Sequence, residues 1–73
     1  MADIDARQMS LVYGRRLREL RKQRQLTQQQ LSDMTGIKRE YISLIEQGRI
    51  DMQMSTFLTL SPALGLTLNF EKN

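Results

Sequence analysis

LTQQQLSDMTGIKREYISLIEQGR, residues 26–49, is the stretch that decides the fold. Thr27 carries a short hydroxyl directly before an apolar pattern, so it is predicted to be the N-cap of a helix, and Gln30 can complete a capping box with it. Gly36 then supplies the positive φ that ends this helix, after which a second apolar pattern begins. Two short helices that meet across a tight turn form a helix-turn-helix, predicted here at about residues 27–46.

The second helix of this motif has two different sides. At about 100° per residue, Ile42 and Ile45 point one way. The opposite side carries Arg39, Glu40, Ser43, Leu44 and Gln47. Such side chains can read base edges, because arginine matches guanine O6 and N7, glutamate accepts from cytosine N4, and an apolar group can lie on the thymine methyl. Leu44 on the solvent side favours this interpretation, although a single exposed leucine is also common in monomers.

The order of residues in the motif resembles the Xre and Cro-like phage repressor family. That family has a Gln opening the first helix, then a small residue, a Gly, an aliphatic residue, an Ile-Ser pair and a late Glu. The matching residues here are Gln28, Ser32, Gly36, Ile37, Ile42, Ser43 and Glu46. Ser32 replaces the usual Ala at similar volume, and its hydroxyl can bond to the preceding turn. The resemblance implies a mainly α, lambda-repressor-like domain of four or five helices that binds DNA in a sequence-specific way.

The resemblance also implies which residues contact DNA. The positions that read bases in the family are held by Lys38, Arg39, Glu40 and Leu44. Phosphate contacts, which set the register and make affinity fall with salt, are expected from Arg24, Gln28, Ser43 and Arg49. Glu40 repels phosphates wherever it does not meet a cytosine. Its other interpretation is therefore a charge partner for Lys38 or Arg39.

Arg21 and Glu46 occupy the places where the family pairs an Arg of the first helix with a Glu late in the reading helix. A partly buried bidentate pair at these places would fix the angle between the two helices. Its net contribution to stability is expected to be small, because desolvation of the two charges offsets much of their attraction.

Length and composition exclude several classes of protein. A chain of 73 residues forms one small domain, for which oligomerisation is a common source of extra stability. No apolar run approaches the ~20 residues of a membrane helix, and no signal-peptide pattern opens the chain, so we expect a cytoplasmic, nucleoid-associated protein. The absence of Cys and His rules out disulfides, zinc sites and His-dependent catalysis. With scattered acids and no Gly-rich phosphate loop, neither an enzyme nor a cofactor or metal site is expected.

The net charge of +3 is less informative than its distribution. Against the single acid Glu19, one short segment holds six basic residues: Arg15, Arg16, Arg18, Arg21, Lys22 and Arg24. A basic helix beside a reading helix favours a phosphate-facing surface. The alternative is an ordinary solvated helix whose basic residues lie near its favourable C-terminal end.

The segment before the motif is predicted to contain an arm and one helix. Residues 1–9 are polar and aperiodic and have Arg7 as their only basic residue, so we expect a flexible, disordered arm rather than a DNA or partner contact. Ser10 is the expected N-cap of the first helix, whose apolar stripe is Tyr13, Leu17 and Leu20. Gln25 stands where many relatives have Gly, which implies a turn made without the easiest left-handed residue.

A fourth helix is predicted to complete a domain that spans residues 10–65. Ser55 is its expected N-cap, and the core is closed by Phe57, Leu58 and Leu60. Pro62 removes the helical bond to the Leu58 carbonyl, so the helix either ends near Leu60 or kinks. We favour the kink, because Leu64 is needed to finish the core.

Residues 66–73 change from helical spacing to alternation, with apolar side chains at Leu66, Leu68 and Phe70. This pattern predicts a short β-strand, which finds its partner most simply in the same strand of a second copy. The resulting homodimer would place two reading helices on a pseudo-palindromic site, about 34 Å apart. The alternative is a frayed tail.

This ending resembles the HipB-type antitoxins, whose C-terminal strands pair in the dimer. The resemblance implies a repressor that binds its own operator and a HipA-type kinase toxin. Two alternatives remain open. One is a phage-type or stand-alone Xre repressor without a toxin, and the other is a protein-interaction module that uses the same helix face.

Overall fold

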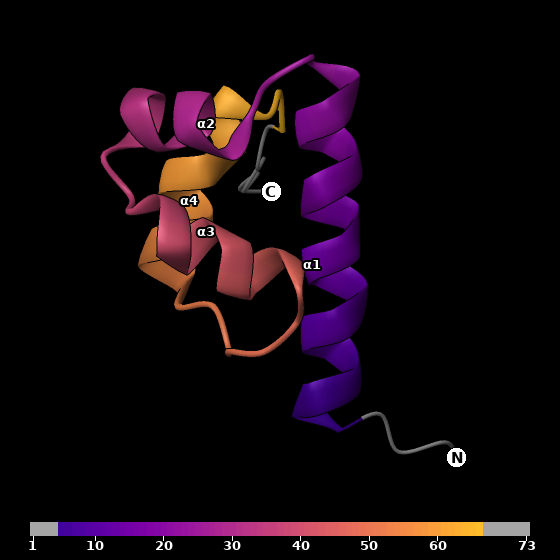
Figure 1. Ribbon diagram of the computed structural model, residues 1–73. Helices are drawn as coiled ribbons and strands as arrows, with labels where there is room; N and C mark the ends of the chain where they lie inside the picture. The colour runs from indigo at the N-terminus through magenta and orange to yellow at the C-terminus, as the bar shows by residue number, and fades with distance from the viewer. Residues whose placement is uncertain (1–4, 67–73) are drawn as a thin grey trace, which may run out of the picture.

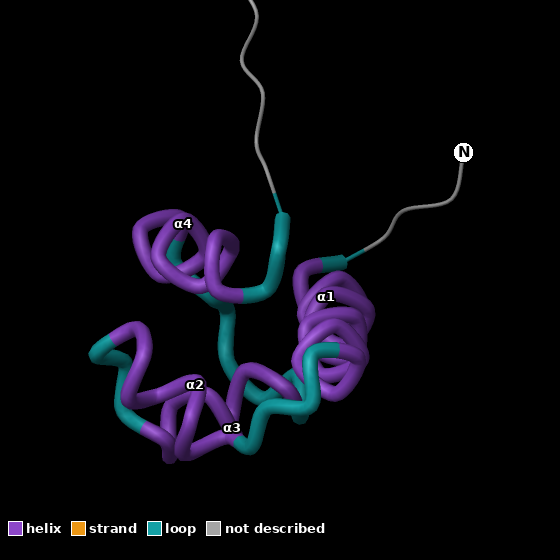
Figure 2. Tube along the Cα trace, turned by 90° about the horizontal axis from the view of Figure 1, so that it is seen from above, coloured by secondary structure: helices purple, strands orange, loops and turns teal. Residues whose placement is uncertain are grey.

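The computed structural model describes residues 5–66, and this part of the chain forms four α-helices and no strand. They are α1 (Ala6–Gln23), α2 (Gln28–Thr35), α3 (Arg39–Glu46) and α4 (Met54–Ala63). The long helix α1 stands along one side, with the three shorter helices gathered beside it (Figure 1). Seen from above, α4 lies behind the α2–α3 pair (Figure 2). The predicted mainly α helix-turn-helix fold is confirmed, and none of the described helices is long and apolar enough to cross a bilayer.

The helix-turn-helix forms because its local signals agree. The Thr27 hydroxyl accepts from the Gln30 N–H at 3.0 Å, and the Gln30 side chain accepts from the Thr27 N–H at 2.8 Å. This is the predicted capping box, which satisfies two donors at the start of α2. Gly36 ends α2 with φ 77°, as predicted. The chain then turns and enters α3 after Lys38.

The core contains residues from all four helical segments. The buried hydrophobic side chains are Leu17, Leu31, Ile42, Ile45, Leu60 and Leu64. Ile42 and Ile45 are 1% and 3% exposed, so α3 is anchored by the side that the sequence analysis expected to face inward. Burial of such side chains stabilises the fold by roughly 1.5–3 kcal/mol each.

The start of α1 differs from the prediction. The helix begins at Ala6 rather than after Ser10, because Asp5 and Gln8 form a capping box one turn earlier. The Asp5 carboxylate accepts from the Gln8 N–H at 2.9 Å. The expected arm over residues 1–9 was therefore wrong from residue 5 onward, while residues 1–4 lie outside the described part.

The close contact of α1 with α3 is made at a glycine that the predicted apolar stripe omitted. Tyr13 is 53% exposed, whereas Gly14 is buried. A Cβ at Gly14 would collide with the Ile45 carbonyl oxygen, so the two backbones touch there. Leu17 is buried one turn later, as predicted. The true packing face is thus turned by about one residue from the predicted one.

Three of the four helices end in a Schellman motif, in which the residue after the C-cap has a positive φ. After α3 that residue is Gly48, with φ 71°, and after α4 it is Gly65, with φ 78°. After α1 it is Gln25, with φ 58°, as expected for a turn without glycine. The motif's long backbone bonds run from Leu26 N–H to Arg21 O, from Arg49 N–H to Leu44 O and from Leu66 N–H to Ser61 O.

Helix α4 begins earlier than predicted. Its N-cap is Gln53 and its first residue is Met54, so Ser55 lies inside the first turn. Leu58 was expected in the core but is 46% exposed, whereas Leu60 is 1% exposed. The observed cap lies two residues before the predicted one.

Pro62 lies inside α4 without ending it at Leu60. The helix continues to Ala63, and the Leu64 N–H donates to the Leu60 carbonyl at 3.2 Å. Leu64 is 2% exposed, so it finishes the core as predicted. The Ser61 hydroxyl donates to the Phe57 carbonyl at 2.6 Å in the same segment.

Leu66, the first residue of the predicted strand, makes contacts within its own chain that the prediction did not include. It is partly buried against the core of its own chain, and its N–H closes the Schellman motif after α4. A hydrophobic contact at this position is a usual companion of that motif. The other predicted dimerisation residues, Leu68 and Phe70, lie outside the described residues.

Arg21 and Glu46 form the ion pair that the resemblance implied. Arg21 Nε donates to Glu46 Oε2 at 2.6 Å and Nη2 donates to Oε1 at 2.9 Å, with both residues buried. The third donor, Nη1, bonds to the Leu26 carbonyl at 2.6 Å. The hydrogen bonds with Glu46, and then its charge, raise the pKa of Arg21 against the opposing effect of burial. The pair thus joins α1 to the end of α3 while both side chains are satisfied.

Replacing Arg21 with Met alone is expected to lower the free energy of unfolding by about 3–5 kcal/mol, because Glu46 is left buried without its cation. The double variant Arg21→Met, Glu46→Leu is expected to lose clearly less, since it removes both charges. Urea unfolding followed by circular dichroism measures both losses. Equal losses in the two variants would argue against burial of the charge as the cause.

Candidate nucleic-acid interface

The outer face of α3 carries the predicted base-reading residues. Lys38, Arg39 and Glu40 are exposed at its start, and Leu44 is 36% exposed one turn later. Figure 2 shows α4 on one side of the α2–α3 pair, and the exposure of these four side chains shows that no helix within residues 5–66 covers this face. An eight-residue helix with one anchored side and one open, polar side has the form needed to enter a major groove.

Arg39 and Glu40 are close but weakly joined. Arg39 Nη2 lies 4.0 Å from Glu40 Oε1, and both side chains are at least half exposed. Exposed pairs of this kind contribute little to stability. The Arg39 guanidinium is therefore able to turn toward a base edge without disrupting the fold.

Gln28 has a structural contact that the sequence analysis did not foresee. Its Nε2 donates to Glu46 Oε1 at 3.1 Å, so its side chain belongs to the buried Arg21–Glu46 network. As the first residue of α2, it still has a backbone N–H that no intrahelical acceptor can satisfy. A phosphate contact here can therefore use the backbone N–H as well as the second hydrogen of the side-chain amide.

A polar cavity of about 380 Å³ lies where α1, α2 and α3 meet. It is lined by Arg18, Gln28, Ser43, Glu46 and Gln47. The Ser43 hydroxyl accepts from Gln47 Nε2 at 2.8 Å and keeps its own hydrogen to donate. Arg18 is exposed at this cavity and supplies a cation. The cavity thus combines donors and positive charge beside the reading face.

Arg18 and Gln47 are candidate contact residues that the sequence analysis did not assign. Gln47 had been placed on the outer side of the reading helix without a role. Arg18 belongs to the basic run, and its position four residues after Gly14 puts it on the side of α1 that meets α3. The four-residue spacing identifies Arg18 as a contact residue only once Gly14 is known to touch α3.

The two remaining predicted phosphate contacts lie in different places. Arg49 is exposed directly after Gly48 and lines an open cavity of about 620 Å³ at the end of α3. The Arg24 guanidinium instead packs on Gly65, so closely that a Cβ at Gly65 would collide with it. Arg24 lines neither cavity beside α3, so the structure does not bring it to the reading face. Its position as the C-cap of α1 directs it to the turn after α4.

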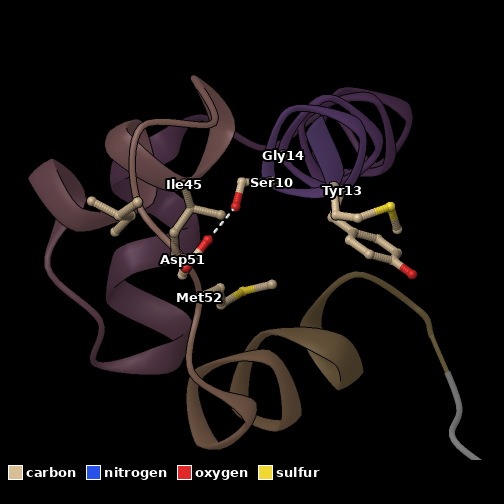
Figure 3. Close-up of a pocket in the computed structure, with 8 residues that line it drawn as sticks. Ser10, Tyr13, Gly14, Ile45, Asp51 and Met52 are labelled. Atoms are coloured by element: carbon tan, nitrogen blue, oxygen red, sulfur yellow. Dashed lines mark hydrogen bonds between the residues drawn. The ribbon is translucent and has the colours of Figure 1, made fainter. Parts of the chain in front are cut away.

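The loop from α3 to α4 is held against α1 by a hydrogen bond between two residues that lie far apart in the sequence. The Ser10 hydroxyl donates to Asp51 Oδ1 at 2.6 Å (Figure 3). Both residues line a cavity of about 210 Å³ whose other lining side chains are largely apolar. Tyr13 and Met52 are two of these lining residues (Figure 3). Ser10 was predicted as a helix cap, but its hydroxyl positions the loop that carries Arg49.

Comparisons with known proteins agree with this geometry. A family model described as a helix-turn-helix domain matches residues 14–70. The immunity repressor protein of Bacillus phage phi105 is 34% identical over 59 residues, and the HTH-type transcriptional regulator PuuR of Escherichia coli (strain K12) is 36% identical over 59 residues. Each alignment covers 81% of this chain but only 41% and 32% of the two regulators, so the chain spans about two fifths and one third of their lengths.

A solved structure gives a match over most of both chains. The restriction-modification controller protein C.AhdI from Aeromonas hydrophila superposes with a TM-score of 0.76 at 33% sequence identity. The match covers 80% of this chain and 88% of the controller protein. The buried side of α3, the capping box of α2 and the similarity over residues 14–70 lead to one conclusion. The chain belongs to the helix-turn-helix domain family, in its Xre-like group.

Proposed function

We propose that this protein is a sequence-specific DNA-binding transcriptional repressor that inserts α3 into the major groove. The observation that carries the proposal is the two-sided character of α3, with Ile42 and Ile45 buried and Arg39 and Leu44 on the open face. The names of two similar proteins, an immunity repressor and a transcriptional regulator, support the same function.

Base readout is assigned to the first half of α3 and to Leu44. Arg39 makes a bidentate contact, donating one hydrogen bond to guanine O6 and one to N7, and Leu44 lies on a thymine methyl. Lys38 donates to guanine acceptors, and Glu40 accepts from a cytosine amino group. Because Arg39 and Glu40 are exposed neighbours 4.0 Å apart, they reach adjacent bases without first breaking a strong ion pair.

Phosphate contacts are assigned to the ring of donors around the open side of α3. The start of α2, the Ser43 hydroxyl, Gln47 and Arg18 share one cavity, and Arg49 lies at the end of the helix. Backbone N–H groups at a helix start bind phosphate well, because they lack intrahelical acceptors and lie at the positive end of the helix dipole. These contacts hold α3 in register while the bases are read.

The repressor is further proposed to act as a homodimer on a pseudo-palindromic operator in the nucleoid. The small size of the domain and the alternation of Leu66, Leu68 and Phe70 support pairing with a second copy. Since Leu66 packs on its own core, the pairing is assigned to the residues that follow it. Two copies would present their α3 helices one helical turn apart, about 34 Å.

Retention on DNA tests the central proposal. Mixed-sequence duplex DNA is expected to retain the protein at 50 mM salt and to release it as salt rises, because phosphate-bound cations are displaced on binding. Titration of fluorescent duplex DNA at several salt concentrations measures the slope. A protein-interaction module would give weak binding with little salt dependence, and that result would contradict the proposal.

The Arg39→Ala variant is expected to lose about 1–3 kcal/mol of affinity for a site selected by the wild-type protein, and to tolerate any base at one position of that site. Selection from a randomised duplex library, followed by sequencing, measures the loss of preference. Arg16→Ala is the matched control. It removes the same charge, and Arg16 pairs with Glu19 on α1, away from α3. An unchanged binding motif in Arg39→Ala would exclude this residue from the reading set.

A HipA-type kinase toxin is the proposed protein partner, which would make this repressor an antitoxin that controls their shared operon. The alternating final segment supports this assignment. Co-expression of the protein with the product of the neighbouring gene is expected to give a complex that purifies together. A neighbouring product without a kinase fold, or one that elutes separately, would favour a stand-alone or phage-type repressor.

A further inference from the structure

The first turn of α1 lies beside the end of α3. Arg7, Leu11, Gly14 and Arg18 follow one another at intervals of four, three and four residues, so they share one face of the helix. Gly14 touches the Ile45 carbonyl oxygen. A Cβ placed on Gly48 would lie 2.7 Å from Leu11 Cδ2 and 2.8 Å from Leu11 Cα. This face is therefore pressed against the last turn of α3 and the residue that follows it.

Two arginines meet at this contact. Arg7 and Arg49 line the open cavity of about 620 Å³, together with Gln47 and Gly48. Gln47 also lines the polar cavity that contains Arg18, so the two cavities adjoin along the end of α3. Figure 1 shows the same arrangement, in which the chain leaving α3 passes alongside α1.

The charge of the Arg7–Arg49 cavity is positive. Both arginines are exposed, and the one carboxylate in the lining is that of Asp51. The Ser10 hydroxyl donates to that carboxylate at 2.6 Å (Figure 3). Two guanidinium groups thus outnumber a carboxylate that already holds a donor, and the cavity favours an anionic ligand.

The spacing of two arginines along α1 exceeds the width of the major groove. Arg7 and Arg18 are eleven residues apart, which is about 16 Å at the rise of an α-helix. Gly14, which touches α3, lies between them. The major groove is about 12 Å wide. If α1 crosses the groove that α3 occupies, this spacing is long enough for the two arginines to reach phosphates on its two opposite rims.

We propose that the first turn of α1 is a further DNA-contacting element, in which Arg7 and Arg49 bind the phosphates of the strand on the rim opposite to that bound by Arg18. The inference rests on the proposed insertion of α3 into the major groove. It assigns a ligand to an arginine outside the helix-turn-helix motif. It also explains why the loop that carries Arg49 is tied to α1 through Ser10 and Asp51.

The salt dependence of binding tests the role of Arg7. On a duplex selected by the wild-type protein, Arg7→Gln is expected to reduce the slope of log affinity against log salt by about 0.9, and affinity roughly five- to tenfold at 0.1 M salt. Arg16→Gln is the control, because Arg16 lies half a turn around α1 and pairs with Glu19 at 3.3 Å. It is expected to leave the slope unchanged. Thermal unfolding is expected to be the same for both variants.

Phosphate ethylation interference tests the assignment of strands. Arg7→Gln is expected to lose sensitivity at phosphates on one strand, and Arg18→Gln at phosphates on the other. Equal slopes for Arg7→Gln and Arg16→Gln, or loss at the same phosphates in Arg7→Gln and Arg18→Gln, would overturn this inference while wild-type binding stands. Absence of salt-dependent binding by the wild-type protein would overturn the proposed function and this inference together.

Discussion

The orientation of α3 depends on the buried ion pair between Arg21 and Glu46. Arg21 uses two donors on Glu46 and a third on the Leu26 carbonyl, while Glu46 also accepts from Gln28. The network thus links α1, the turn after it, α2 and α3 at one point. Removing two charges from water is costly, and their attraction compensates only when the remaining donors and acceptors are satisfied. Among residues 5–66 that condition is met, since every buried side-chain nitrogen and oxygen has a hydrogen-bond partner.

Because the network and the apolar core hold α3 from its inner side, the outer side is free to vary. Ile42 and Ile45 contribute burial, whereas Arg39 and Leu44 take no part in the core. A fold of this kind can change its recognised sequence through surface residues alone, which is how one scaffold serves different regulators. The exposed residues in the first turns of α1 can vary in the same way. The family match begins at residue 14, while the helix begins at Ala6, so the first turns of α1 precede the matched residues.

Features set by neighbouring residues could be predicted from the sequence, whereas features set by distant partners could not. The capping box at Thr27 and the left-handed Gly36 are local, and both were predicted correctly. The start of α1 was missed because its capping box lies in a segment that looked irregular. Gly14 has no side chain, so an apolar pattern cannot reveal that it touches α3. For Gln28 and Arg24, the partners Glu46 and Gly65 lie far along the chain, and only the fold shows that these side chains are already engaged.

The turn after α1 has a consequence for protein engineering. Gln25 holds a left-handed backbone conformation at φ 58°, which costs a residue other than glycine about 1–2 kcal/mol. The turn is needed, because it brings the Leu26 carbonyl to Arg21. The strain is therefore tolerated at an exposed position that none of the proposed DNA contacts uses. Exchanging Gln25 for glycine would therefore remove this strain and raise thermostability without altering the recognised operator.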